Sequence, residues 1–399
     1  MRRDLRLLMG AVLATALGDF VALVALVLEV HETSGSGLAV AALFGAHMVP
    51  VVALAPAAGL LVDRVESVRL LVLVSLAQAG AAAALAFVGG LGPILALSAL
   101  LGAGVAVSQP AEFALTPAVV GDGDQTEANG HLESARYVGF TAGPLIGGAL
   151  AAAGGTKLAM LVNAASFLFV AGSALALRAR RPRPARAEAG ERDRARDGFA
   201  FLRSDAVLRV VITAAVAGLL FMSASIAVEV FYIRDVVGAG AIGYAFTTAA
   251  WTAGMVAGAG GLAARWGRDR LATAALAALV LQGAGMAFSA TWAVLPVAVA
   301  GFAFGGVAHG VKNVLMRSLI LERTPDRLHG RTFAAYNAAR NTAELGALAA
   351  GGVLVSVLGA QLALFLAGLG PVVVGLLALT VLQSGLSGPN QEEMIGARI

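Results

Sequence analysis

The chain contains no cysteine, and charged residues make up only 13% of its 399 residues. The absence of cysteine excludes disulfides, thiolate metal sites and cysteine nucleophiles. A soluble domain has roughly 25% charged and 45–50% apolar residues, whereas this chain is 59% apolar. The scarcity of charge therefore excludes a water-soluble globular protein and indicates an integral membrane protein.

Lysine is nearly absent as well, because only Lys157 and Lys312 among the 28 basic residues are lysine. Abundant arginine, alanine, glycine and valine suggest a GC-rich bacterial genome. The formal net charge is only +4, and no extended basic face can form outside the loops, which argues against nucleic acid as a partner. The motifs G-x-x-x-x-G-K-[ST], G-x-S-x-G and H-E-x-x-H are also missing. We therefore expect no enzyme, no metal and no cofactor.

Long apolar runs fill most of the chain. A bilayer core of about 30 Å needs roughly 20 residues of helix, and lipid admits only helices or closed barrels. The runs are too long for barrel strands and lack their alternation, so we predict an all-α integral membrane protein with twelve transmembrane helices. The predicted spans lie near 8–30, 38–62, 68–89, 93–119, 130–153, 158–177, 207–230, 239–264, 271–289, 292–320, 333–357 and 360–383.

Basic residues are distributed unevenly between the loops. With the N-terminus inside, 23 of them fall in inward loops and ends, whereas the outward loops hold only Lys157 and Arg234. By the positive-inside rule both termini then lie in the cytoplasm. We expect a multi-pass protein of a bacterial inner membrane, surrounded by lipid and monomeric, since one chain suffices for this architecture.

A single polar stretch divides the spans into six and six. Because it has too few apolar residues to fold alone, we predict a flexible linker, with attraction to anionic lipid headgroups as the alternative. The predicted parts are an N-terminal six-helix bundle (1–177), the cytoplasmic linker (178–206), a C-terminal six-helix bundle (207–383) and a cytoplasmic tail (384–399).

The two halves also repeat one another in sequence. Short segments of the first half recur in the second, in the same order and at an offset of 202 to 204 residues. The matched segments are 59–63 with 261–265, 104–106 with 306–308, and 135–150 with 339–354. Matches in order at a nearly constant offset indicate a duplicated six-helix unit, which is the design of many secondary transporters.

Two motifs resemble those of a known family, the major facilitator superfamily. One is similar to the antiporter motif in helix 5 of its exporters, and it comprises Gly130, Gly139, Gly143, Pro144, Gly147 and Gly148. The other, containing Gly59, Asp63 and Arg64, resembles the signature loop between helices 2 and 3, although Glu66 stands where the family usually has glycine. Segments of helices 4–6 and 10–11 are most similar to the branch of macrolide-efflux and siderophore-export proteins.

The resemblance implies two halves that rock around a central cavity and exchange protons for an amphipathic drug or natural product, with the proton gradient as energy source. Three alternatives remain open: a dedicated exporter of one metabolite or siderophore, a lysolipid transporter, and a membrane sensor or scaffold that transports nothing. The family often has a coupling arginine in helix 4, where this chain has Ser98.

The glycines of the antiporter-like motif also have a physical interpretation. Gly139, Gly143 and Gly147 are four residues apart and form a ridge that lets another helix approach closely. Gly254 and Gly258 of predicted helix 8 offer a complementary surface, and the resemblance implies that this seam seals the two halves near the outer face. It also implies that Asp63 holds an inner gate at the N-terminal end of helix 11, where the helix dipole favours a carboxylate; ordinary interfacial charges are the alternative for Asp63 and Arg64.

Charges inside predicted spans are candidates for function, because burying one costs about 2.5–3.5 kcal/mol on insertion scales. Asp19 lies roughly 16 Å into helix 1 by the helical rise, and Glu344 in helix 11 is the other central carboxylate. A carboxylate at this depth suits reversible protonation or the binding of a cationic substrate. A structural hydrogen bond to a neighbouring helix is the alternative.

The remaining span charges lie in the cytoplasmic halves of their helices. Glu112 and Arg136 in one half, and Lys312 and Arg340 in the other, are predicted either to pair within each half or to form an inner gate across the halves. Glu133 competes for Arg136, because the two are three residues apart on one helix face. Lys312 has a further alternative, since its long side chain can reach the membrane surface.

Overall fold

The computed structural model describes residues 3–120, 125–179, 191–262, 270–325 and 328–386. Within these ranges every regular element is a helix, and eleven helices are long and apolar enough to cross a membrane. The predicted all-α, membrane-spanning fold class is thus confirmed. The predicted span 239–264 corresponds to α9 (Gly240–Ala257) and the short π-helix η2 (Gly258–Leu262), and its end lies outside the described residues.

Six helices form the first half: α1 (Arg3–Ser34), α2 (Gly37–Arg64), α3 (Ser67–Leu85), α4 (Leu91–Val120), α5 (Gln125–Gly154) and α6 (Thr156–Ala176). Helix α1 packs against α5 and α6, and α2 packs against α4. Local signals define the helix starts, since the Ser36 side chain accepts a hydrogen bond from the Ala39 amide at the start of α2. Glu66 accepts hydrogen bonds from the amides of Val68 and Arg69 at 3.1 and 2.8 Å, so this departure from the family pattern serves as the N-cap of α3.

The second half contains α8 (Ala206–Phe231), the π-helix η1 (Tyr232–Val236), α9, η2, α10 (Leu271–Ser289), α11 (Leu295–Arg323), α12 (His329–Leu358) and α13 (Ala360–Leu386). Helix α11 packs against α9 and α10, and α8 packs against α12 and α13. The order of contacts repeats that of the first half, where α5 packs on α1 and α4 on α2. This agreement fits the repeat in the sequence.

One further helix, α7 (Glu191–Ser204), lies in the stretch predicted as a flexible linker. It packs against α12 and α8, and Leu202 is buried in the same apolar cluster as Leu208 and Ile320. Asp205 then caps α8 and pairs with Arg323 at 3.0 Å. The prediction was wrong for this part of the linker because the apolar residues 198–202 give the helix a face to bury; residues 180–190 lie outside the described part.

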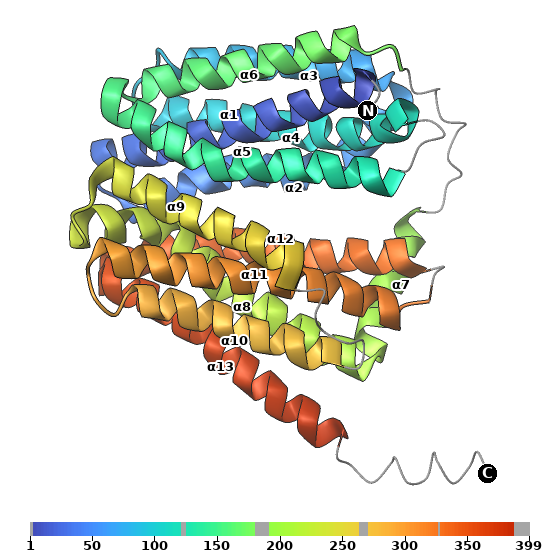
Figure 1. Cartoon of the computed structure of the whole chain (residues 1–399), viewed down its shortest axis with the longest axis vertical. Coiled ribbons are helices and arrows are strands. Elements are labelled where there is room, and N and C mark those ends of the chain that lie inside the picture. Colours follow the sequence, from blue (N-terminus) through green and yellow to red (C-terminus); the bar gives the residue numbers. More distant parts are fainter. Residues whose placement is uncertain (1–2, 121–124, 180–190, 263–269, 326–327, 387–399) are drawn as a thin grey trace.

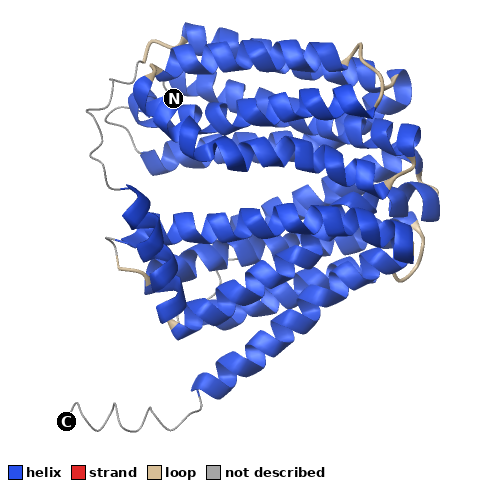
Figure 2. Cartoon of the chain, turned by 180° about the vertical axis from the view of Figure 1, so that it is seen from behind, coloured by secondary structure: helices blue, strands red, loops and turns tan. Residues whose placement is uncertain are grey.

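The two halves lie side by side with their helices roughly parallel (Figure 1). We call the end at which α1 begins and α6 and α13 end the linker end, and the opposite end the far end. The largest apolar cluster contains residues of both halves, such as Val27 of α1 and Val228 of α8. Toward the linker end each half has its own cluster, around Leu8 and Leu115 in the first and Leu208 and Ile320 in the second. The halves therefore share one core at the far end only, and their ribbons diverge toward the linker end (Figure 2).

Close helix packing makes a stability prediction possible at Gly102. A Cβ at this position would overlap the backbone carbonyl oxygen of His47, whereas one at Gly80 of α3 would have no neighbour within 4 Å. We expect Gly102→Val to separate α4 from α2 and to reduce the yield of monodisperse protein several-fold, as overpacking against backbone does. Gel filtration after detergent extraction measures the yield. An unchanged yield, matching the Gly80→Val control, would contradict this packing.

Candidate functional site

The glycine ridge of the antiporter-like motif packs inside the first half. A Cβ on Gly139 would lie 2.7 Å from the Ala16 Cβ, and one on Gly143 would lie 2.6 Å from the Phe20 Cβ. Gly147 meets the backbone of α1 in the same way. The prediction that this ridge forms a seam between the halves was therefore wrong: it joins α5 to α1.

The complementary surface of α9 faces a different helix from the one predicted. Gly254 and Gly258 pack against the backbone of α11, at Ala303 and Val307. One glycine of the motif, Gly148, does meet the other half, where it packs against α9. Gly148 directly follows Gly147 in the chain. Because successive residues of a helix are rotated by about 100°, Gly148 lies off the ridge that faces α1.

Parts of both motifs lie outside the described part of the chain. The side chains of Asp63 and Arg64, together with Gly59 and Gly130, lie outside the described part, although all four belong to α2 or α5. Pro144 lies inside α5 as predicted. The proposed contact of Asp63 with the start of α12 thus stays a prediction.

Asp19 lies on α1, beside the ridge of α5, and its side chain is only partly buried. It lies within electrostatic reach of Glu112 and Arg136. No described side chain forms a hydrogen bond or ion pair with it, so the alternative of a structural hydrogen bond finds no support in the described part of the chain. A partly accessible carboxylate without a fixed partner can gain and lose a proton or bind a cation.

Glu112 and Arg136 form an ion pair within the first half, with 3.6 Å between the Glu112 Oε2 and Arg136 Nη2 atoms. Arg136 also lies 3.7 Å from Glu133, so the predicted local pair coexists with it. Glu112 is only 6% exposed. With Asp19 these residues form what we call the N-half charge cluster: Asp19, Glu112 and Arg136. The alternative of a gate across the halves is wrong for this pair in this conformation, because both residues belong to one bundle.

Lys312 and Arg340 lie together in the second half, in a pocket on α8, α11 and α12. The lining residues are Ala215, Val216, Leu219, His309, Lys312, Asn313, Tyr336 and Arg340. Lys312 is only 4% exposed, so the alternative that its side chain reaches the membrane surface is wrong. Two cations cannot pair with each other, and no described carboxylate forms an ion pair with either. Glu344 lies one helical turn beyond Arg340 and is partly buried.

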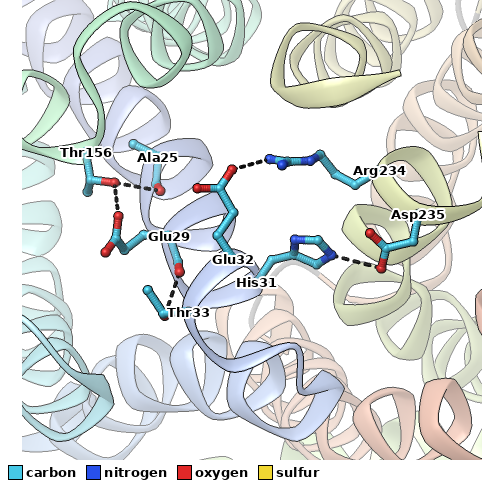
Figure 3. A network of polar contacts seen from close by, with 8 residues as sticks. All are labelled: Ala25, Glu29, His31, Glu32, Thr33, Thr156, Arg234 and Asp235. Carbon is cyan, nitrogen blue, oxygen red and sulfur yellow. Dashed lines mark hydrogen bonds and ion pairs between the residues drawn. The ribbon is translucent and has the colours of Figure 1, made fainter. Parts of the chain in front are cut away.

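A polar bridge between the halves at the far end was not predicted. Glu32 accepts a hydrogen bond from Arg234 at 2.7 Å, and His31 contacts Asp235 at 3.0 Å (Figure 3). We call these four residues the far-end bridge. A signal existed, since acidic residues end predicted helix 1 and Arg234 is one of two outward basic residues. Because the Glu32 and Asp235 side chains are about half exposed, each pair contributes only about 0–1 kcal/mol and can break without a large barrier.

Comparison with solved structures places this architecture among transporters. The nucleoside transporter NupG has a TM-score of 0.74 at 11% identity, with 95% of this chain and 99% of that chain covered. A peptide transporter POT in complex with sulfate has a TM-score of 0.75 at 15% identity, covering 96% and 95%. A bacterial homologue of the human lysosomal transporter Spinster, in an inward-facing and unoccupied conformation, has a TM-score of 0.70 at 14% identity, covering 95% and 96%.

These identities show a shared fold, and no curated protein matches the chain. The family assignment comes from the sequence itself, because residues 8–346 match the family described as Major Facilitator Superfamily. The match covers most of both six-helix halves. A multi-pass membrane protein with this match is a transporter and not an enzyme. The chain belongs to the Major Facilitator Superfamily.

Proposed function

We propose that this transporter couples the inward movement of protons to the export of an amphipathic drug or natural product from a bacterial cell, with its linker end in the cytoplasm. The observation that carries the proposal is Asp19, a carboxylate inside a membrane helix with no fixed partner in the described part of the chain. The resemblance of the sequence to macrolide-efflux and siderophore-export proteins supports the choice of substrate class.

The charges of the N-half cluster explain how Asp19 can act. Arg136 neutralises Glu112 through their ion pair, so a deprotonated Asp19 leaves the cluster with a net charge of −1. A charge inside the membrane is unfavourable unless it is compensated. Protonation of Asp19, or a cationic substrate group beside it, removes this charge. A proton and a cationic group therefore compete for the same carboxylate, which is the requirement for their exchange.

The packing of the halves supports a conformational cycle. They share a core and the far-end bridge at one end and have separate cores at the other. Separation at the far end breaks the weak ion pairs of the far-end bridge and parts the shared apolar core, as expected for a rocking motion between two packed states. We propose that the present conformation opens toward the linker end, which would correspond to the inward-facing conformation of the Spinster homologue.

The proposal is tested in sealed, inverted membrane vesicles that are energised to be acid inside. A pH-sensitive dye reports proton release when amphipathic cations, macrolides or siderophores are added. We expect at least one compound class to trigger release in vesicles that contain the protein and none in vesicles without it. Silence across the panel, with folded protein present, would contradict drug/proton exchange and favour a dedicated metabolite or a lysolipid as substrate.

A further inference from the structure

The pocket around Lys312 and Arg340 is a second charged site, distinct from the N-half charge cluster. The two residues lie at the same depth, because each is eleven residues from the linker-end terminus of its helix, or about 16 Å by the helical rise. Both side chains line the same pocket. Their charges are therefore close together, inside the second half.

The internal repeat shows what this pocket lacks. Arg340 is the counterpart of Arg136, at an offset of 204 residues. Arg136 pairs with Glu112 on α4, and α11 is the counterpart of α4. The offset of 202 that relates Gly104 to Gly306 places Val314 where Glu112 would stand. The second half has thus no acid at this position, and Lys312 adds another cation.

His309 adds a further polar group to the pocket. The Nδ1 atom of His309 is buried and has no hydrogen-bond partner in the described part of the chain. Glu344 is the acid nearest in sequence to Arg340, and the two charged groups interact electrostatically. Counted with Lys312 and Arg340, it still leaves a net charge of +1. A buried cation without a partner is unfavourable, so the arrangement is suited to a ligand that supplies the missing anion.

We propose that Lys312 and Arg340 bind the anionic group, a carboxylate or a phosphate, of the transported substrate. The guanidinium group of Arg340 matches the two oxygens of such a group, and the ammonium group of Lys312 adds a compact charge. Val216 and Leu219 line the same pocket and contact the apolar part of the substrate. The inference rests on the proposed transport of an amphipathic substrate and specifies its chemistry: a zwitterion whose anionic group lies beside Lys312 and Arg340 and whose cationic group faces Asp19.

Direct binding without a pH gradient tests this inference independently of proton exchange. The probes are 1-naphthoate, 1-naphthyl phosphate, the neutral 1-naphthamide and the cation 1-naphthylmethylammonium, which share one apolar ring system. Equilibrium dialysis of the purified full-length protein in detergent measures the dissociation constant of each. We expect at least one of the two anions to bind tenfold or more tightly than the amide, and the comparison of carboxylate with phosphate identifies the preferred group.

Matched variants assign the binding to the pocket. Lys312→Gln and Arg340→Gln are expected to weaken anion binding tenfold or more and to leave the amide unchanged, and Arg340→Lys is expected to lose less than Arg340→Gln. Lys157→Gln, which changes the only other lysine of the chain, serves as control and keeps wild-type binding.

Three results would overturn the inference: equal affinity for the anions and the amide, preference for the cation, or anion binding that folded Lys312→Gln and Arg340→Gln proteins retain. Gel filtration establishes that each variant is folded, and two separate positions keep the test valid if one variant fails to fold. If wild-type protein releases no protons in the vesicle assay but still prefers the anions in equilibrium dialysis, the proposed proton coupling is refuted and the anion site is retained.

Discussion

The Asp19→Asn variant is expected to lose net, proton-driven transport by more than tenfold while it still exchanges substrate for substrate. Asparagine keeps the size of the side chain and cannot release a proton at neutral pH. The N-half charge cluster then stays neutral, as it is when Asp19 is protonated, so the halves can still rock with substrate bound. Purified protein in proteoliposomes measures both activities: accumulation under an imposed pH gradient, and counterflow without one.

The matched control for this prediction is Glu322→Gln, the same loss of charge at an exposed carboxylate in the last turn of α11. We expect wild-type accumulation and counterflow from it. Wild-type accumulation by Asp19→Asn would show that Asp19 carries no coupling role. Loss of both accumulation and counterflow in folded protein would instead indicate that the substrate cannot stay bound without the Asp19 carboxylate, or that Asp19 positions the helix.

Cross-linking the far-end bridge is expected to abolish transport to below a tenth of the wild-type rate. The chain has no cysteine, so the double variant His31→Cys with Asp235→Cys contains only the two introduced thiols. The His31 Nε2 and Asp235 Oδ2 atoms are 3.0 Å apart in different halves, so a short bis-methanethiosulfonate reagent can link the cysteines. The link holds the far end closed, and a substrate bound in the cavity can then leave only toward the linker end.

Reduction of this link should restore transport, because the reagent forms cleavable disulfides with the two cysteines. Each single cysteine variant, treated with the same reagent, is the control and is expected to keep its untreated rate. A cross-linked double variant that transports at the untreated rate would show that the halves need not separate at the far end. The proposed conformational cycle would then be wrong.

The fold could be predicted from the sequence because membrane helices depend on local properties. An apolar run of sufficient length leaves the backbone no alternative to a helix in lipid, and the repeat between the halves predicted their similar packing. Helix α7 was missed because its apolar segment is short and its charged residues resemble a solvated linker. Its stability comes from burial of Leu202 against α8 and α12, which is a tertiary effect.

The residues of the site could be predicted from the sequence, whereas their contacts could not. Charge inside a span identified Asp19, Glu112, Arg136, Lys312 and Arg340 as candidates, because such residues are unfavourable without a role. The partners of these residues depend on which helices pack together. The spacing of residues along a helix identifies one face of that helix, but it does not identify the helix that packs against this face. The glycine ridge of α5 was therefore assigned to the wrong helix, and reach to the membrane surface stayed open as an alternative for Lys312.

The far-end bridge illustrates the same limit over a longer distance. Glu32 and Arg234 are separated by 202 positions in the chain, and nothing local indicates that they meet. Their proximity follows from the packing of α2 on α12 and of α5 on α9, which brings the ends of α1 and α8 together. Opposite charges in two outward loops were the only available signal.

The most direct test of the central claim, that Asp19 couples proton movement to substrate export, is dye-reported proton release in energised inverted vesicles. Vesicles with wild-type protein, Asp19→Asn or Glu322→Gln in equal amounts receive the same substrate. We expect equal proton release from wild type and Glu322→Gln and none from Asp19→Asn. Equal release from all three vesicle preparations would contradict the claim.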